Sequence, residues 1–321
     1  MSLPTDIMLR PARLQDIPEI ARISAGIWDG EDYVPRVAAG WISDPSGRFV
    51  AAEHEGIVRG FGRIVMHTAT DAWAEGLRVD PSFRRHGVAR AIVRHLLDQA
   101  RTLGARRLRF STSIQNIESI ALNESLGFRK IAGLRFFDCD RDQFPSVVAR
   151  ITARAGQMTA GRQIRIRRVC SWEPNDPFIL AVRNSKTVAG AGGMLPSGFV
   201  FYPGEPGCIL QMADRGCGFE ARGCANAPFP DAVLLMDAAT ESQPDDGDYV
   251  ISVLEGEPAS CWALLSAAFD AMSGAGMKSA CACVPCNSTA AAILEEAGFE
   301  TWPGDVPAES PAILLYEYLL S

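Results

Sequence analysis

The stretch that decides the fold reads Leu77-Arg78-Val79-Asp80-Pro81-Ser82-Phe83-Arg84-Arg85-His86-Gly87-Val88-Ala89. It predicts a strand that ends at Asp80-Pro81, a tight turn, and a helix that runs to about residue 100. The first N–H groups of a helix have no intrahelical partner, so they can bind an anion. Small residues at 87 and 89 let the backbone approach a phosphate closely, and positive charge comes from Arg84, Arg85, Arg90 and Arg94. We expect this turn to bind a pyrophosphate.

The spacing of the turn differs from the two best-known phosphate loops. Neither Gly-x-x-x-x-Gly-Lys-Ser/Thr nor a Gly-x-Gly-x-x-Gly after a strand is present. The pattern Arg84-x-x-Gly87-x-Ala89 resembles instead the acetyl-coenzyme A motif of the GNAT acetyltransferase superfamily. A second segment is similar to another signature of that family: Asn116-x-x-Ser119-x-x-Leu122-x-Glu124-x-x-Gly127-Phe128. Either signature alone is also compatible with an ordinary capped surface helix. Residues 9–12 and 16–20 resemble the family's first strand and helix, so that the resemblance covers residues 7 to about 140.

The resemblance implies an α/β fold class, in which a central mixed, mostly antiparallel sheet is flanked by helices. The length of 321 residues favours two domains. Residues 276–299 repeat the pattern of residues 104–128, including Asn287-x-x-Ala290-x-x-Ile293-x-Glu295-x-x-Gly298-Phe299. We therefore expect two tandem GNAT folds: an active domain at 1–150, a linker at 151–162 and a degenerate copy at 163–321.

The second copy lacks the residues that would bind a coenzyme. Glu255 and Glu257 stand where the first copy has its Arg-rich turn, and they would repel a pyrophosphate. Residues 178–182 and 186–190 are expected to be strands, which leaves too little chain for the two helices that shape an acceptor site. Residues 196–247, rich in Gly, Pro and Asp, fit a long surface excursion.

Cysteines gather in the second half, and a zinc site is one interpretation of Cys281-x-Cys283-x-x-Cys286. The repeat places the first two on a strand, and no Cys-x-x-Cys pair has a matching partner. We expect buried thiols and no metal.

Composition bounds the remaining classes of function. The chain is 47% hydrophobic and 21% charged, as in a globular protein. It has no apolar run of a length that spans a membrane and no secretory leader, so a cytoplasmic protein without membrane contact is expected. Residues 1–150 carry 21 Lys and Arg against 18 Asp and Glu, whereas residues 151–321 carry 10 against 20. Because nucleic-acid binding needs a clustered basic face, the acidic second half argues against such a partner. The oligomeric state is left open.

The resemblance also implies which residues bind acetyl-coenzyme A and perform the chemistry. The family holds the thioester carbonyl with a backbone N–H at a bulge of its fourth strand, which points to Val79, with Leu77 beside the pantetheine arm. The expected coenzyme-binding residues are Leu77, Val79, Arg84, Arg85, His86, Gly87, Val88, Ala89, Arg90, Asn116 and Asn123. Glu75 lies on the same strand and is the expected general base; an idle strand-end glutamate is the competing interpretation. Asn123 stands where the family has a proton-donating Tyr, which puts acid catalysis in doubt because an amide has no proton to give.

The acceptor site is predicted on the segment that resembles the family's first two helices. Its polar and aromatic residues could receive a small cationic amine, or they could form a solvated acidic loop; they are Trp28, Asp29, Glu31, Asp32 and Tyr33. The expected function is transfer of an acetyl group from acetyl-coenzyme A to a primary amine of a small molecule or amino acid. A non-catalytic acyl-coenzyme A sensor, a protein-binding module and acetylation of a protein amine are the alternatives.

Overall fold

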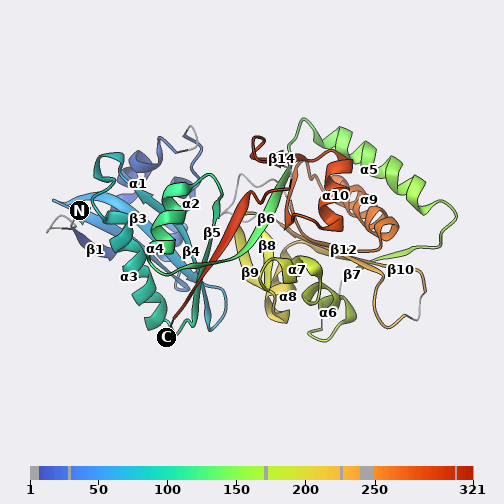
Figure 1. The fold of residues 1–321 in the computed structure, drawn as a ribbon, viewed down its shortest axis with the longest axis horizontal. Helices are drawn as coiled ribbons and strands as arrows, with labels where there is room; N and C mark the ends of the chain where they lie inside the picture. The colour runs from blue at the N-terminus through green and yellow to red at the C-terminus, as the bar shows by residue number, and fades with distance from the viewer. Residues whose placement is uncertain are drawn as a thin grey trace. The chain divides into compact units, whose positions relative to one another are not determined.

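The chain forms two compact units. The computed structural model describes residues 7–27, 30–169, 173–224, 227–238, 249–307 and 309–320 (Figure 1). The first unit combines Met1–Phe110, Ile117–Arg129 and Tyr316–Ser321, and the second combines Ser111–Asn116 and Lys130–Leu315. These units differ from the expected ranges, because residues 111–116 and all residues from 130 to 315 count with the second unit, and the last residues return to the first.

The first unit is a sheet with helices on both faces. Its strands lie in the order β1-β2-β3-β4-β5-β15. The pairings from β1 to β4 are antiparallel, and β4 pairs β5 in parallel. The strands are β1 (Met8–Pro11), β2 (Gly47–His54), β3 (Ile57–Met66), β4 (Asp71–Val79), β5 (Arg107–Ser113) and β15 (Ile313–Leu319). The helices are α1 (Ile17–Ser24), α2 (Val34–Ser43), α3 (Val88–Thr102) and α4 (Ile117–Ser125), with one-turn helices η1 (Leu14–Asp16) and η3 (Pro81–Phe83).

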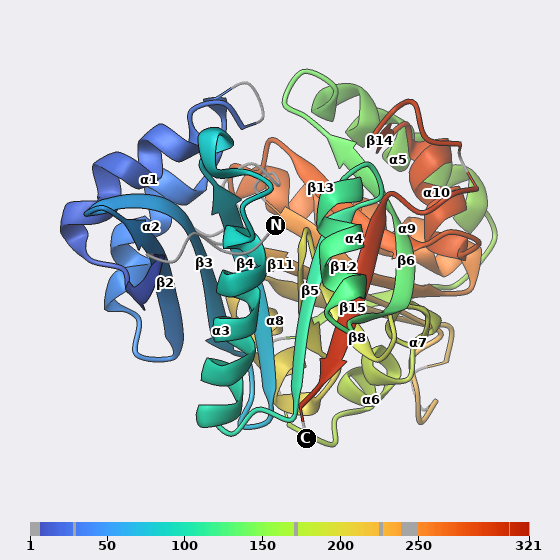
Figure 2. The same ribbon diagram turned by 60° about the vertical axis from the view of Figure 1, so that its left-hand side comes forward.

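Alternation along β3 divides the two faces of this sheet. Phe61 belongs to a buried cluster with residues of α1 and α2. A Cβ at Gly60 or Gly62 would instead lie within 3.1 Å of Ile92 on α3. Helix α3 therefore covers the face opposite to α1 and α2, as Figure 2 shows for its position in front of β3 and β4. The glycines allow α3 to pack close to the sheet, and the chain enters α3 directly after the short turn that follows β4.

The second unit repeats this plan. Its strands lie in the order β7-β10-β11-β12-β13-β6, and β12 pairs β13 in parallel, as β4 pairs β5. The strands are β6 (Arg129–Cys139), β7 (Arg165–Val169), β10 (Cys217–Arg222), β11 (Ala232–Ala238), β12 (Tyr249–Gly256), β13 (Ala280–Pro285) and β14 (Glu300–Trp302), with a hairpin of β8 (Met194–Ser197) and β9 (Val200–Pro203). The helices are α5 (Phe144–Thr159), α6 (Pro177–Arg183), α7 (Lys186–Gly190), α8 (Pro206–Arg215), α9 (Pro258–Gly274) and α10 (Thr289–Ala297).

Each unit takes a strand from the part of the chain that was expected to form the other. Strand β6, expected in the first domain, pairs β13 in the second unit. From Tyr316 onward, β15 counts with the first unit, although its sequence ends the second half. The repeat was visible in the sequence, but this exchange of strands was not.

Three local predictions for the second half were wrong. Residues 178–182 and 186–190 form helices α6 and α7 instead of strands, because Asp176 and Ser185 cap their first turns through hydrogen bonds to Phe178 N (2.7 Å) and Val188 N (3.2 Å). The two helices thought to be missing are therefore present. The supposed surface excursion at 196–247 contains the β8–β9 hairpin, α8 and two strands of the sheet.

The expected linker at 151–162 is also largely regular structure. Residues 151–159 continue helix α5, whose residues Val147 and Ile151 are fully buried. Among the helices that the structure describes, none is long and apolar enough to cross a membrane.

Candidate functional site

The turn after β4 is held in place by Asp80. Its carboxylate accepts hydrogen bonds from Ser82 N at 3.0 Å and Ser82 Oγ at 2.7 Å. It also pairs with Arg22 at 2.7 Å and Arg59 at 3.2 Å. These hydrogen bonds outweigh the opposing effect of burial and hold the pKa of Asp80 far below its usual range. The start of the turn is therefore fixed by a permanently charged carboxylate.

The residues after Asp80 form a turn whose side chains are mostly exposed to solvent. Arg85 and Gly87 both have left-handed backbones, with φ of 63° and 79°. Gly87 precedes α3, and no side chain caps the helix there. Uncapped first-turn N–H groups beside left-handed residues form the kind of nest that binds anions. Arg84, Arg85 and His86 are exposed around it, whereas Val88 is buried and its side chain packs into the core.

Arg90 and Ala89 lie on the first turn of α3. The guanidinium of Arg90 donates to Ser125 Oγ on α4 at 2.8 Å, so this residue links the two helices. It remains partly exposed beside the turn.

Strand β4 carries a bulge directly before this turn. Phe61 is paired with Arg78 and Arg63 with Glu75, so β4 has one more residue than β3 between these pairs. The extra residue falls at Gly76 or Leu77, and Gly76 has φ of 65°. Val79 lies in regular register opposite Gly60. The bulge was expected at Val79, and the structure shifts it toward the start of the strand.

The two central strands separate beside the bulge. β4 pairs β5 at Asp71, Ala72 and Trp73, where the pairing of the two strands ends, although β4 continues to Val79. The paired end is fixed by Arg109, which contacts Asp71 and also bonds Glu317 at 2.9 Å. From Ala74 onward the described residues of β4 and β5 are thus no longer paired with each other.

Glu75, the expected base, is held by an arginine. Its side chain is 8% exposed and accepts a hydrogen bond from Arg63, its cross-strand partner. Burial raises the pKa of Glu75, and the Arg63 guanidinium acts against this rise. A carboxylate with a raised pKa suits proton abstraction near neutral pH. It is neither the solvated nor the isolated glutamate that the sequence allowed.

The two asparagines of the second signature have different surroundings. Asn123 is 4% exposed, and its amide donates to Ser119 O at 2.9 Å within α4. Asn116 is exposed and belongs to the second compact unit. A phenol from β15, that of Tyr316, donates to Glu124 on α4 at 2.9 Å. Burial and the Glu124 carboxylate raise the pKa of Tyr316 to about 12.

The expected acceptor residues that the structure describes have different surroundings. Asp32 is buried and forms a bidentate ion pair with Arg78 of β4, at 3.0 and 2.9 Å. Its charge is thus used within the protein, which corrects the expectation of a free acid for a cationic amine. Glu31 is exposed, and Tyr33 packs edge-on against Trp41 at 5.9 Å. Trp28 and Asp29 lie outside the described residues.

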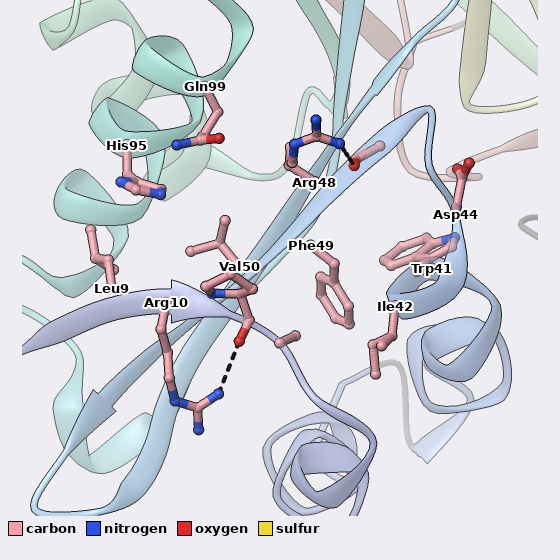
Figure 3. A pocket seen from close by; sticks show the side chains of 13 residues that line it. Leu9, Arg10, Trp41, Ile42, Asp44, Arg48, Phe49, Val50, His95 and Gln99 are labelled. Carbon is pink, nitrogen blue, oxygen red and sulfur yellow. Dashed lines mark hydrogen bonds between the residues drawn. The ribbon is translucent and has the colours of Figure 1, made fainter. Parts of the chain in front are cut away.

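A hollow of about 300 Å³ lies elsewhere in this unit (Figure 3). It is lined by β1, by the start of β2, by Trp41 and Asp44 of the α2 region, and by His95 and Gln99 of α3. β1 and β2 form the edge of the sheet, with β3 between them and β4. The hollow shares Trp41 and Asp44 with the surroundings of the bulge, whereas the turn at residues 84–87 does not contribute to its lining.

The corresponding parts of the second unit differ at the helix terminus. β12 also carries a bulge, at Ser252, and its pairing with β13 ends at Ile251. The first turn of α9, however, is capped by Glu257, whose carboxylate accepts from Ser260 N at 3.2 Å. The strand features are thus repeated, whereas the anion-binding features are replaced by an acid. Within the described part of the chain, no group of three or more His, Cys, Asp or Glu side chains is arranged to hold a metal.

Comparison with known proteins relates the part of the chain that carries this site to a known family. Residues 14–128 match the model of the acetyltransferase (GNAT) family. The ribosomal protein bS18-alanine N-acetyltransferase of Salmonella typhimurium is 41% identical over 54 residues, which cover 17% of this chain and 36% of that enzyme. The chain thus spans about a third of the length of the curated relatives it first matches.

Two solved structures resemble the chain along almost its whole length. A GCN5-related N-acetyltransferase from Sphaerobacter thermophilus is 13% identical with a TM-score of 0.63, and the match covers 99% of this chain and 97% of that one. A tandem GNAT protein from the clavulanic acid biosynthesis pathway is 11% identical with a TM-score of 0.58, covering 98% and 99%. At this identity the likeness shows the fold alone.

Proposed function

The chain carries a domain of the acetyltransferase (GNAT) family at residues 14–128, and on that premise we propose that it is an acetyl-coenzyme A-dependent N-acetyltransferase with one active site per chain. The observation that carries the proposal is the turn at residues 84–87. Its two left-handed residues and the uncapped start of α3 fit a pyrophosphate, and Arg84 and Arg85 add charge beside it. Acetyl-coenzyme A would supply the activated acetyl group as a thioester.

Residues near the bulge would hold the rest of the coenzyme. The part of β4 that does not pair β5, from Ala74 to Val79, would lie along the pantetheine arm, with Leu77 and Val79 beside it. The residues that would hold the phosphates and the adjoining groups are Arg84, Arg85, His86, Gly87, Val88, Ala89 and Arg90. Asn116 and Asn123 belong to this proposed set only through the family's second signature, since the amide of Asn123 is engaged within its own helix.

The chain supplies two groups for the chemistry. Backbone N–H groups at the bulge, Gly76 or Leu77, would stabilise the charge that develops on the carbonyl oxygen. Glu75 would remove a proton from the acceptor amine, directly or through water, because a protonated alkylamine cannot attack. A leaving thiolate, with a pKa near 8.5, gains little from Tyr316, whose pKa of about 12 keeps its own proton bound. Water is therefore the proposed proton source.

The acceptor is proposed to be a primary amine of a small molecule or an amino acid. Because Asp32 is paired with Arg78, recognition of a cationic acceptor would fall to Glu31 and to the segment around it. The likeness to an enzyme named for a ribosomal-protein alanine favours, as a second candidate, the amino terminus of a protein. The second unit is proposed to bind no coenzyme, because Glu257 already caps the helix at its equivalent position.

The test is a substitution that imitates the second unit. Gly87→Asp places an acid at the start of α3, where its negative charge repels phosphate. Calorimetry of the wild type is expected to give one molecule of acetyl-coenzyme A per chain. Gly87→Asp should weaken binding at least about 10-fold, or about 1.4 kcal/mol. Gly104→Asp is the matched control, because Gly104 is exposed, has φ of 86°, and a Cβ added there would meet no other atom within 4 Å.

Thiol release from acetyl-coenzyme A then separates the alternatives. An amine, amino-acid or peptide panel that stimulates release identifies a transferase. Coenzyme binding without release on any acceptor would instead identify a sensor. Absence of binding heat, or equal affinity in Gly87→Asp, would remove the turn as the coenzyme site.

A further inference from the structure

Arg63 on β3 connects Glu75 to a second carboxylate. The Nη1 group donates to Glu75 on β4, and Nη2 donates to Asp44 at the end of α2. Arg63 is 5% exposed, and its guanidinium lies 4.8 Å from the centre of the Trp41 ring. One buried cation is thus shared by two anions from different elements.

The surroundings leave Arg63 little freedom to move. A Cβ at Gly47 would lie 2.9 Å from the backbone oxygen of Ile64 and 3.1 and 3.2 Å from Nε and Nη2 of Arg63, so the glycine packs closely against the arginine. Trp41 contacts one side of the guanidinium and also packs against Gly76 at the bulge, where a Cβ would lie 2.7 Å from its ring. The end of α2, Arg63 and the bulge therefore form one packed group.

We propose that Arg63 and Asp44 are positioning residues that fix the orientation and protonation of Glu75, with Asp44 drawing the shared guanidinium away from it. The proposal rests on the function proposed above, in which Glu75 is the base. Neither residue touches the reacting atoms. Both residues act through Glu75, and their effects on its carboxylate oppose each other.

The physical basis is that two carboxylates share one positive charge, each through its own Nη group. A planar guanidinium directs its N–H groups along fixed directions, so an Arg63 drawn toward Asp44 cannot also move closer to Glu75. The charged groups that act on Glu75 are Arg63 from β3, which lowers its pKa, and Asp44 from the end of α2, which raises it. Removing the Asp44 charge should therefore lower the pKa of Glu75, and removing the Arg63 charge should raise it.

Asp44→Asn is the informative variant. The side chain of Asp44 is 26% exposed, and its Oδ1 atom accepts from Ser46 N and Oγ, which asparagine can still do. The local turn should therefore persist while the charge disappears. Arg63→Met removes the cation, and Arg63→Lys retains a charge without the two-pronged donor.

The readout is the titration of the Glu75 carboxyl carbon, followed by carbon-detected NMR and assigned by its absence in Glu75→Gln. We expect Asp44→Asn to move the midpoint down and Arg63→Met to move it up, each by about 1 pH unit. Arg63→Lys should fall between Arg63→Met and the wild type. The acid limb of kcat/KM should shift in the same directions, with KM for the coenzyme unchanged.

Asp98→Asn is the matched control, since Asp98 is 72% exposed in an i,i+3 pair with Arg101. This control should move neither the NMR titration midpoint of Glu75 nor the acid limb of kcat/KM. A Glu75 midpoint that stays in place in Asp44→Asn overturns the inference, and this variant decides alone if Arg63→Met does not fold. A shifted NMR midpoint in a protein without transferase activity would support the coupling and overturn only the proposed function.

Discussion

Phe110 and Tyr316 lie face to face, with ring centroids 5.3 Å apart and ring planes inclined by 11°, although they come from opposite halves of the chain. Around them, Phe128 packs against Tyr318 at 5.3 Å, and Leu320 N donates to Arg106 O at 2.9 Å. The C-terminal residues thus complete the core of the first unit.

Tyr316→Ala should therefore destabilise the unit that carries the proposed active site. Tyr316 is 1% exposed, and loss of a buried aromatic ring costs about 3–5 kcal/mol. Urea denaturation measures the loss, and Leu319→Ala, at a residue 67% exposed, is the control. A fragment of residues 1–150 lacks this strand and should not bind coenzyme with full affinity. Full affinity in that fragment would show that the strand is dispensable.

Glu75→Gln should lower kcat by about 100-fold or more, because general base catalysis contributes about that much. The base must be ionised to act, and burial raises the pKa of Glu75 above its ordinary value of 4.5. The wild-type rate should therefore fall as the pH decreases through a midpoint above 4.5. The glutamine variant should lack this limb. An unchanged rate across the pH range would exclude Glu75 from catalysis.

Asp80→Asn should reduce both stability and coenzyme affinity, because it removes the charge that holds Ser82, Arg22 and Arg59 together. Loss of charged hydrogen bonds costs about 1–3 kcal/mol. The folded-state pKa of Asp80 lies below its ordinary value of 3.8, so its stabilisation is present above that pH and is lost as the pH falls further. The difference in unfolding free energy between wild type and variant should shrink on acidification. A difference independent of pH would contradict the ion-pair explanation.

Asp32→Asn distinguishes an internal ion pair from an acceptor site. The Asp32 side chain is 1% exposed, so breaking its pair with Arg78 should cost about 3 kcal/mol of stability. KM for cationic amines should change no more than KM for neutral ones. Glu31→Gln, at an exposed acid of the same segment, is the comparison. A rise in KM confined to cationic amines in Asp32→Asn would return Asp32 to the acceptor site.

Gly76→Ala should disturb the bulge. Its left-handed backbone strains any side chain, and the new Cβ would lie 2.7 and 2.8 Å from ring atoms of Trp41. We expect a loss of about 3 kcal/mol and of transferase activity. Trp41→Phe in the same chain should restore part of the stability. Gly104→Ala has a similar φ but no neighbouring atoms, and it should cost only about 1 kcal/mol.

Motifs in the local sequence indicated the family, which is confirmed by the family match over residues 14–128. They also indicated the fold class, which is confirmed by the whole-length structural neighbours. The prediction of secondary structure was wrong where an apolar run, which favours a strand, follows residues that cap a helix. Residues 178–182 are apolar enough for a strand, yet Asp176 and Pro177 start a helix there. Those capping signals were present in the sequence and could have been used.

No comparable sequence signal linked Arg63 to the candidate site. Its role depends on pairing with Glu75 across β3 and β4, and a bulge near Gly76 changes which residues of β4 face α2. Asp44 then approaches from a helix on that face. Register and bulge position are set by the packing of whole elements, so an arginine in an apolar strand could not be linked to these two acids beforehand.

The sequence by itself determined the Asp80-Pro81 stop, the glycine turn and the start of α3, because each depends on backbone preferences and hydrogen bonds between residues a few positions apart. Only the tertiary structure decided that Asp32 forms an ion pair with Arg78, that Glu75 shares Arg63 with Asp44, and that Tyr316 completes the core of the first unit. Those contacts join residues distant along the chain. Their formation is governed by strand register and by the burial of charge in a common core, which no local pattern encodes.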